Sequence, residues 1–181
     1  MVGVGVLQEL LKTHRPSDSF YVYDLSILTQ AYEEWKRVFP TITPYYAVKC
    51  NPDTRLVSHL ANLGACFDCA TPAEFKAVLD LGVSPSRIIY ANPCKRNEDI
   101  SLAAKHKITR TTFDSVYELK KMATVFPECQ LLLRIRADDP SARCNLGVKY
   151  GAEEHEWDVL LFTARTLGLD VIGVSFHVGS F

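Results

Sequence analysis

The chain has 181 residues, of which 48% are hydrophobic and 23% are charged, and its formal net charge is -1. This composition is typical of a globular protein with a sizeable core. The interspersed, nearly balanced charge argues against a chain built to bind nucleic acid or anionic lipid. No apolar run approaches the length of a membrane span.

Six cysteines would indicate disulfides in a small secreted chain. This chain is large and core-rich, and its apolar start has no signal-peptide pattern, so we expect reduced thiols and a cytosolic protein. Only Cys66 and Cys69 are closely spaced. Because residues three apart on a strand point to opposite faces, their sulfurs would not converge, and no metal site is predicted.

Residues 1–40 are predicted to form a lead-in to the main domain. An apolar first helix begins the chain, a strand follows over residues 19–25, and apolar residues at helical spacing indicate a helix over residues 26–39. Pro40 ends that helix. We assign the second domain to residues 41–181.

The stretch Pro44–Asn51 (PYYAVKCN) predicts a short apolar strand with a lysine at its C-terminal end. Ala47 and Val48 are the apolar neighbours on the N-terminal side of Lys49. A lysine deprived of water favours its neutral, nucleophilic amine, as in lysines that bond covalently to carbonyl groups. A solvated lysine at a strand end is the alternative, and the octapeptide alone favours that alternative.

From this strand onwards, five β-rich segments recur, centred near residues 46, 67, 89, 111 and 133. The segments between them are amphipathic, and two of these open with capping boxes, Thr71–Glu74 and Ser115–Glu118. A sixth strand is predicted over residues 171–177, after an irregular loop over residues 137–151 and a helix over residues 154–167. The alternation predicts βαβ units and a parallel sheet.

The regular spacing of these units favours a (β/α)8 barrel over a doubly wound sheet. About six of the eight strand-helix units are present, and a closed barrel needs about 250 residues. We therefore predict an α/β fold with an incomplete barrel, a truncated product that exposes the edges of its first and last strands.

Polar residues gather where the predicted strands end, which is where the active site of a barrel lies. A buried arginine needs an anionic partner, so Asp68 or the oxygens of a cofactor are expected to face Arg134. A structural ion pair between Asp68 and Arg134 is the alternative. The polar residues at the strand ends are Lys49, Asp68, Asn92, Asp114, Arg134, Arg136 and His177.

The segment after His177 predicts a phosphate site. Gly179 and Ser180 there would form a tight turn with free amides and a hydroxyl. The alternative is a core histidine beside an ordinary turn. Glu74 has its own alternative, as the capping-box residue of its helix.

Several segments, in order between about Ser19 and Ser180, resemble the eukaryotic-type ornithine decarboxylases. These are pyridoxal-phosphate enzymes whose catalytic domain is a (β/α)8 barrel. The resemblance implies that the predicted strand over residues 19–25 belongs to a β-domain that lies mostly outside this chain. Because independent motifs occur in the same order, the resemblance is specific. The motifs are PYYAVKCN (44–51), FDCA (67–70), IIYANPCK (88–95), LRIR (133–136) with Asp138 and Asp139, GVKYG (147–151) and GVSFHVGS (173–180).

The resemblance implies that pyridoxal 5'-phosphate is the cofactor and that Lys49 holds it covalently. His177 is then the imidazole that stacks on the cofactor ring, so Lys49 and His177 are the expected catalytic residues. Ser180 is implied to bind the cofactor phosphate. The family continues with glycine where Phe181 stands here.

The same resemblance implies that Asp68, Glu74 and Arg134 form a polar cluster beside the ring and its hydroxyl. Lys149 is implied to face the partner subunit of a homodimer. The family is cytosolic, makes putrescine from L-ornithine in polyamine biosynthesis, and has antizyme as a possible partner.

Other residues that the family uses come after Phe181, including the acid opposite the ring nitrogen and the acids that bind the distal amine of ornithine. We therefore expect this chain to be inactive alone. The alternatives are a non-catalytic homologue like antizyme inhibitor, a lysine, arginine or diaminopimelate decarboxylase of the same family, and a cofactor carrier on a similar barrel. The presence of Asp68 and Arg134 favours the enzyme.

Overall fold

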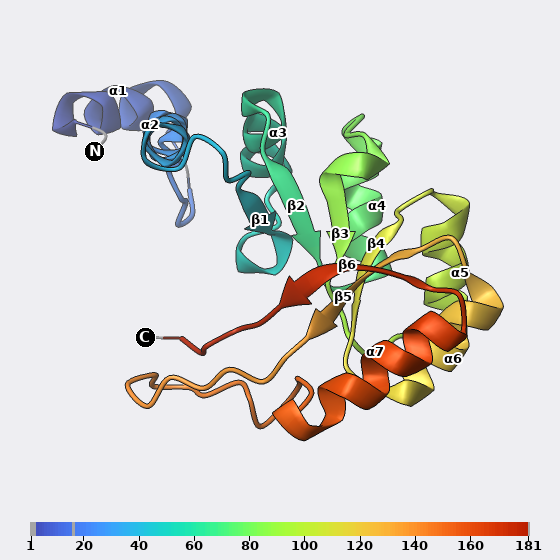
Figure 1. Ribbon diagram of the computed structural model, residues 1–181. Helices are drawn as coiled ribbons and strands as arrows, with labels where there is room; N and C mark the ends of the chain where they lie inside the picture. The colour runs from blue at the N-terminus through green and yellow to red at the C-terminus, as the bar shows by residue number, and fades with distance from the viewer. Residues whose placement is uncertain (1–2, 16, 181) are drawn as a thin grey trace.

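The computed structural model describes residues 3–15 and 17–180 (Figure 1). Six strands form one parallel sheet in which consecutive strands are neighbours. This is the strand order of a barrel, because a doubly wound sheet reverses its order at a switch point. The strands are β1 (Tyr45–Ala47), β2 (Cys66–Cys69), β3 (Ile88–Tyr90), β4 (Arg110–Phe113), β5 (Gln130–Arg134) and β6 (Asp170–Ser175).

The predicted parallel sheet is confirmed, and the observed strand ends differ from the predicted ones by no more than two residues. Helices lie along the outer side of the curved sheet (Figure 1). They are α3 (Thr54–Leu63), α4 (Pro72–Asp80), α5 (Asn97–Lys105), α6 (Val116–Val125) and α7 (Trp157–Thr166), with single 3-10 turns η1 (Val48–Cys50), η2 (Pro85–Arg87) and η3 (Glu154–Glu156).

The two predicted capping boxes begin α4 and α6, but only half of each box forms. The Thr71 hydroxyl accepts the Glu74 amide and the Ser115 hydroxyl accepts the Glu118 amide, each at 3.3 Å. The glutamate carboxylates do not return to the cap residues and bind elsewhere, Glu74 at the Ala70 amide and Glu118 at Lys95. Both carboxylates therefore bind groups in the loops near the strand ends instead of the cap residues.

Two clusters of buried side chains hold the helices against the sheet. One lies under α3, α4 and α5 and includes the edge-to-face pair of Phe75 and Tyr90, with ring centroids 5.5 Å apart. The other joins α6 and α7 to β4 and β5, and Phe113 and Leu119 are fully buried in it. This packing fixes the ends of the strands, where the polar residues lie.

The N-terminal segment differs from its prediction. Helices α1 (Val4–His14) and α2 (Leu25–Val38) lie beside the sheet (Figure 1), and α2 packs on α3 through Leu28 and Tyr32. The predicted strand over residues 19–25 is wrong, because residues 19–24 are irregular and Leu25 already belongs to α2. A strand needs hydrogen-bonding partners for its backbone, and no described strand pairs with this segment.

The last strand exposes apolar side chains. Ile172, Val174 and Phe176 are 45%, 59% and 61% exposed. In the described residues β1 and β6 each pair on one side only, as predicted for an incomplete barrel. The described helices include none that is long and apolar enough to cross a membrane. The boundary between residues 40 and 41 stays a prediction.

Candidate active site

A cavity of about 460 Å³ lies at the C-terminal ends of the strands. Each strand, or the loop that directly follows it, contributes a polar side chain to the wall. Taking one polar lining side chain for each strand, in strand order, gives Lys49, Asp68, Asn92, Thr112, Arg134 and His177. Five of these are predicted from the sequence, and Thr112 is not. The barrel topology thus brings together residues that are up to 128 positions apart (177 minus 49) in the chain.

Lys49 lies at the cavity, but not at the end of a strand. Strand β1 ends at Ala47, and Lys49 is in the turn η1. The Tyr46 hydroxyl donates to the Asn51 carbonyl at 3.0 Å, which closes the chain into this turn. Val48 is 1% exposed whereas Lys49 is exposed, so the predicted desolvation of the lysine by its neighbours is wrong.

Asp68 is half-buried on β2 and is surrounded by charged groups. Burial raises the pKa of Asp68 above its ordinary value, with a smaller rise from Glu74, whereas Lys49, Arg134 and His177 act in the opposite direction. No ion pair joins Asp68 to Arg134 among the described residues, so the structural ion pair considered as an alternative is not formed. These three basic side chains and the Asp68 carboxyl therefore share the lining of this cavity.

Replacing Asp68 with asparagine is expected to change the pH dependence of stability. The raised pKa of Asp68 means that its folded state holds the proton more tightly than the unfolded state, whose value is near 3.8. The stability that this carboxyl contributes is complete below pH 3.8 and is lost as the pH rises through the folded-state pKa. We expect the free energy of unfolding of Asp68→Asn, relative to wild type, to increase between pH 3.5 and pH 7, as urea titrations would measure. A relative stability that is the same at both pH values would contradict this.

Glu74 holds the loop that follows β2. Its carboxylate accepts the Ala70 amide at 2.6 Å, and Ala70 and Thr71 both line the cavity. Glu74 itself is not among the lining residues, and it acts on Asp68 through charge. Its predicted place beside the cofactor ring stays a prediction.

The turn after His177 does not offer free amides. The Gly179 amide donates to His177 Nδ1 at 3.0 Å, and the Ser180 amide donates to the Cys144 carbonyl at 3.1 Å. The prediction of free amides is wrong because the loop over residues 137–151 returns to pair with this segment (Figure 1). Gly179 has φ +109°, and a Cβ atom there would lie 2.5 Å from the Cys144 carbonyl oxygen.

Ser180 does not line the cavity, and its role as a phosphate ligand stays a prediction. Phe181 lies outside the described residues. Lys149 does line the cavity, with its Nζ 5.1 Å from the centroid of the Tyr150 ring. Its predicted place at a subunit interface is not tested.

Two other residues at the strand ends serve the long loop rather than the cavity. The Arg136 guanidinium pairs with Asp138 at 2.7 Å and with Glu153 at 2.5 Å. The Asp114 carboxylate accepts the Gly151 amide at 3.0 Å. Neither Arg136 nor Asp114 lines the cavity, so the common rim predicted from the sequence is only partly formed.

Two hydroxyl groups that the sequence did not indicate are left unsatisfied in the cavity wall. Thr112 Oγ1 and Ser175 Oγ are buried and have no hydrogen-bond partner among the described residues. Both residues line the cavity. Because buried hydroxyls almost always have a partner, these two fit a site that receives a polar ligand.

The cysteines and histidines show no sign of a metal site. No group of three or more metal-ligating side chains occurs in residues 3–15 and 17–180. Cys66 and Cys69 are buried free thiols, and burial raises the pKa of Cys69 to about 12. Such a thiol is inert at neutral pH.

Comparison with known proteins identifies the family. Residues 25–181 match the family described as pyridoxal-dependent decarboxylase, pyridoxal binding domain. The chain belongs to this family. The sequence resemblance and the barrel-type fold are therefore confirmed, and the cavity lies in the pyridoxal-binding domain.

The chain is similar to the ornithine decarboxylase of Saccharomyces cerevisiae, with 50% identity over 163 residues, which are 90% of this chain and 35% of that protein. Among solved structures it is similar to the arginine decarboxylase of Paramecium bursaria Chlorella virus, with a TM-score of 0.94, 44% identity, and coverage of 97% of this chain and 47% of that one. A third relative is a mutant of SrLDC in complex with PLP, with a TM-score of 0.91, 35% identity, and coverage of 99% of this chain and 46% of that one. The chain spans about 35% of the length of the first curated relative.

The residues that line the cavity fit pyridoxal phosphate. Lys49 supplies the primary amine that an aldehyde requires. Arg134 is a cation for the cofactor's anionic oxygens. His177 offers a flat ring, and the unsatisfied hydroxyls of Thr112 and Ser175 offer hydrogen bonds. This donor set agrees with the family match.

Proposed function

We propose that this chain forms the cofactor-binding part of an enzyme that decarboxylates L-ornithine to putrescine. The observation that carries the proposal is Lys49, an exposed amine in the wall of a cavity that Asp68, Arg134 and His177 also line. Identity of 48% to 50% with curated ornithine decarboxylases of yeast, rat and mouse supports ornithine as the substrate.

When bound, pyridoxal phosphate supplies an aldehyde that condenses with amines and a ring that accepts the electron pair left by departing carbon dioxide. Lys49 Nζ would hold the cofactor, and the same amine is placed to carry a proton within the cavity. Asp68, whose pKa is raised by burial, can retain a proton near the cavity. His177 is held in one orientation by the Gly179 amide on its Nδ1.

We also propose that this chain alone does not turn over ornithine. Asp68 is the only acid among the described residues that line the cavity. The reaction needs an acid for the ring nitrogen and others for the distal amine of ornithine, and one carboxyl cannot serve both. The proposal further includes a cytosolic homodimer, polyamine biosynthesis as the pathway and antizyme as a partner. The exposed apolar side chains of β6 support burial against further protein.

The experiment separates cofactor binding from turnover. The 181-residue chain, incubated with pyridoxal phosphate and borohydride, is expected to carry the cofactor on Lys49 and to release no carbon dioxide from carboxyl-labelled ornithine. The protein product of a longer reading frame that contains this chain is expected to release carbon dioxide from ornithine in preference to lysine, arginine or diaminopimelate. Similarity to the viral arginine decarboxylase makes arginine the most informative competitor.

Each result decides one alternative. A chain that takes no cofactor on Lys49 would favour a non-catalytic homologue, such as an antizyme inhibitor. Preference for arginine or lysine would correct the substrate, and turnover by the isolated chain would overturn its predicted inactivity.

A further inference from the structure

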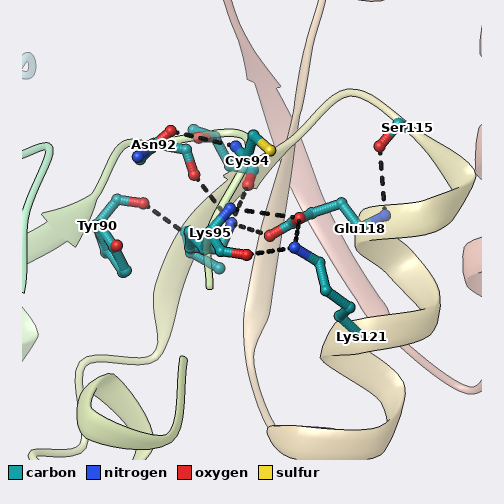
Figure 2. Close-up of polar contacts among 9 residues, drawn as sticks. Tyr90, Asn92, Cys94, Lys95, Ser115, Glu118 and Lys121 are labelled. Atoms are coloured by element: carbon teal, nitrogen blue, oxygen red, sulfur yellow. Dashed lines mark hydrogen bonds and ion pairs between the residues drawn. The ribbon is translucent and has the colours of Figure 1, made fainter. Parts of the chain in front are cut away.

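A buried cluster of charges lies behind the cavity wall, between the loop after β3 and helix α6 (Figure 2). Lys95 and Glu118 are only 3% and 1% exposed. Lys95 Nζ lies 2.8 Å from Glu118 Oε1, and Lys121 Nζ lies 2.6 Å from Glu118 Oε2. One carboxylate is therefore shared by two ammonium groups, one of them fully buried.

The buried ammonium also reaches the wall of the cavity. Lys95 Nζ donates to the Asn92 carbonyl at 2.9 Å and to the Thr112 carbonyl at 2.8 Å. Asn92 and Thr112 both line the cavity, on the β3 and β4 sides. Lys95 Nζ therefore makes two hydrogen bonds to backbone carbonyls and one ion pair, and Glu118 Oε1 accepts no hydrogen bond in the described residues.

The two carbonyls lie beyond the end of the β3–β4 ladder, although Thr112 is still paired with Leu132 of β5. The β3–β4 ladder ends with the pair Tyr90 and Thr111, one residue before Thr112 and two before Asn92. Beyond that point Lys95 links the two segments in place of a ladder hydrogen bond. Lys121 makes no such link, because its partners are Glu118, the Lys95 carbonyl and the Tyr117 ring.

We propose that Lys95 is a positioning residue of the cavity, which holds the Asn92 and Thr112 backbone in the geometry that the bound cofactor requires. Glu118 supplies the charge that keeps the ammonium in place, and Lys121 supports Glu118 from outside. The part of this inference that concerns cofactor binding rests on the proposed function. The part that concerns the positions of the Asn92 and Thr112 backbone is independent of it.

The chain offers a matched pair of variants. Lys95→Met and Lys121→Met each remove one ammonium from the same carboxylate and leave the other in place. Only Lys95→Met removes the donor to the cavity carbonyls. If Lys95→Met does not fold, the double variant Lys95→Met/Glu118→Gln takes its place, because it leaves no buried carboxylate without its inner partner.

Hydrogen exchange of the 181-residue chain without cofactor tests the backbone claim. We expect exchange in the peptides around residues 91–93 and 112–114, which Lys121 does not contact, to become at least about tenfold faster in Lys95→Met and to change less than about twofold in Lys121→Met. The exchange rates are compared at a temperature well below the unfolding midpoints of both variants, so that global unfolding does not contribute to the exchange. Equal acceleration in the two variants would show a role in stability alone and would overturn the inference.

Absorbance titration with pyridoxal phosphate tests the consequence for the cofactor. Lys95→Met is expected to bind about tenfold more weakly, with borohydride still fixing the cofactor on Lys49, and Lys121→Met to stay within about twofold of wild type. A Lys95→Met variant that binds as tightly as wild type would overturn the inference. If the wild-type chain itself takes no pyridoxal phosphate, the proposed function fails, and the exchange comparison still decides the position of the two segments.

Discussion

Replacing Lys49 with methionine is expected to abolish the borohydride-dependent attachment of pyridoxal phosphate to this chain. The side chain of methionine is close to lysine in length but has no amine, so no covalent bond to an aldehyde can form. Lys49 is exposed and lines the cavity, so the amine is accessible and the substitution removes no packed core. Mass mapping of the reduced chain would show the cofactor mass on the peptide that contains Lys49 in wild type, and on none in the variant.

The matched control is Lys149→Met, because Lys149 is the other lysine that lines the cavity in the described chain. This variant is expected to keep the cofactor mass on Lys49. Attachment that survives Lys49→Met and disappears in Lys149→Met would assign the reactive amine to Lys149 instead. Equal unfolding temperatures of the two variants would show that the fold is not the cause.

The fold could be predicted because its signals are local. Each strand is a short apolar segment, and helix starts such as Thr71-Pro72 carry their own capping residues, so periodicity and spacing placed all six strands. The strand over residues 19–25 had the same local signal. It failed because a strand also needs a neighbour, and no described strand lies beside this segment.

Within the site, the predictable part is the set of side chains at strand ends, because parallel strands of a barrel end on one side. The local backbone was not predictable. The turn at Lys49 depends on the Tyr46 hydroxyl reaching Asn51, and the loss of free amides near Ser180 depends on Cys144 returning from a distant loop. Neither contact follows from periodicity.

The burial of Lys95 also could not be predicted from the local sequence. In the sequence it follows IIYANPC and has no feature that separates it from a solvated lysine at a helix start. Its burial follows from α6 bringing Glu118 across 23 positions of the chain (118 minus 95). The capping box indicated Glu118 as a cap residue, and its carboxylate instead became the partner of a buried ammonium.

Replacing Glu118 with leucine is expected to lower the free energy of unfolding by roughly 3–5 kcal/mol, the usual effect of removing one partner of a buried ion pair. The substitution leaves Lys95 fully buried without an anion, and it also leaves Lys121 without one. Lys95→Met/Glu118→Leu is expected to recover most of this loss, because apolar side chains of similar volume replace a buried pair at little cost. Urea unfolding at pH 7 measures both variants.

The loss in Glu118→Leu is expected to shrink as the pH rises. Burial lowers the pKa of Lys95 below its ordinary value of 10.5, and Glu118 opposes that shift, so removing Glu118 lowers the pKa further. The unfolded chain then binds more protons than the folded chain between the two pKa values, and by linkage stability rises with pH across that window. The deficit at pH 9.5 should therefore be smaller than at pH 7, whereas the double variant, which has no buried ammonium, should show no such change. A deficit independent of pH would mean that packing, and not the unpaired charge, sets the effect.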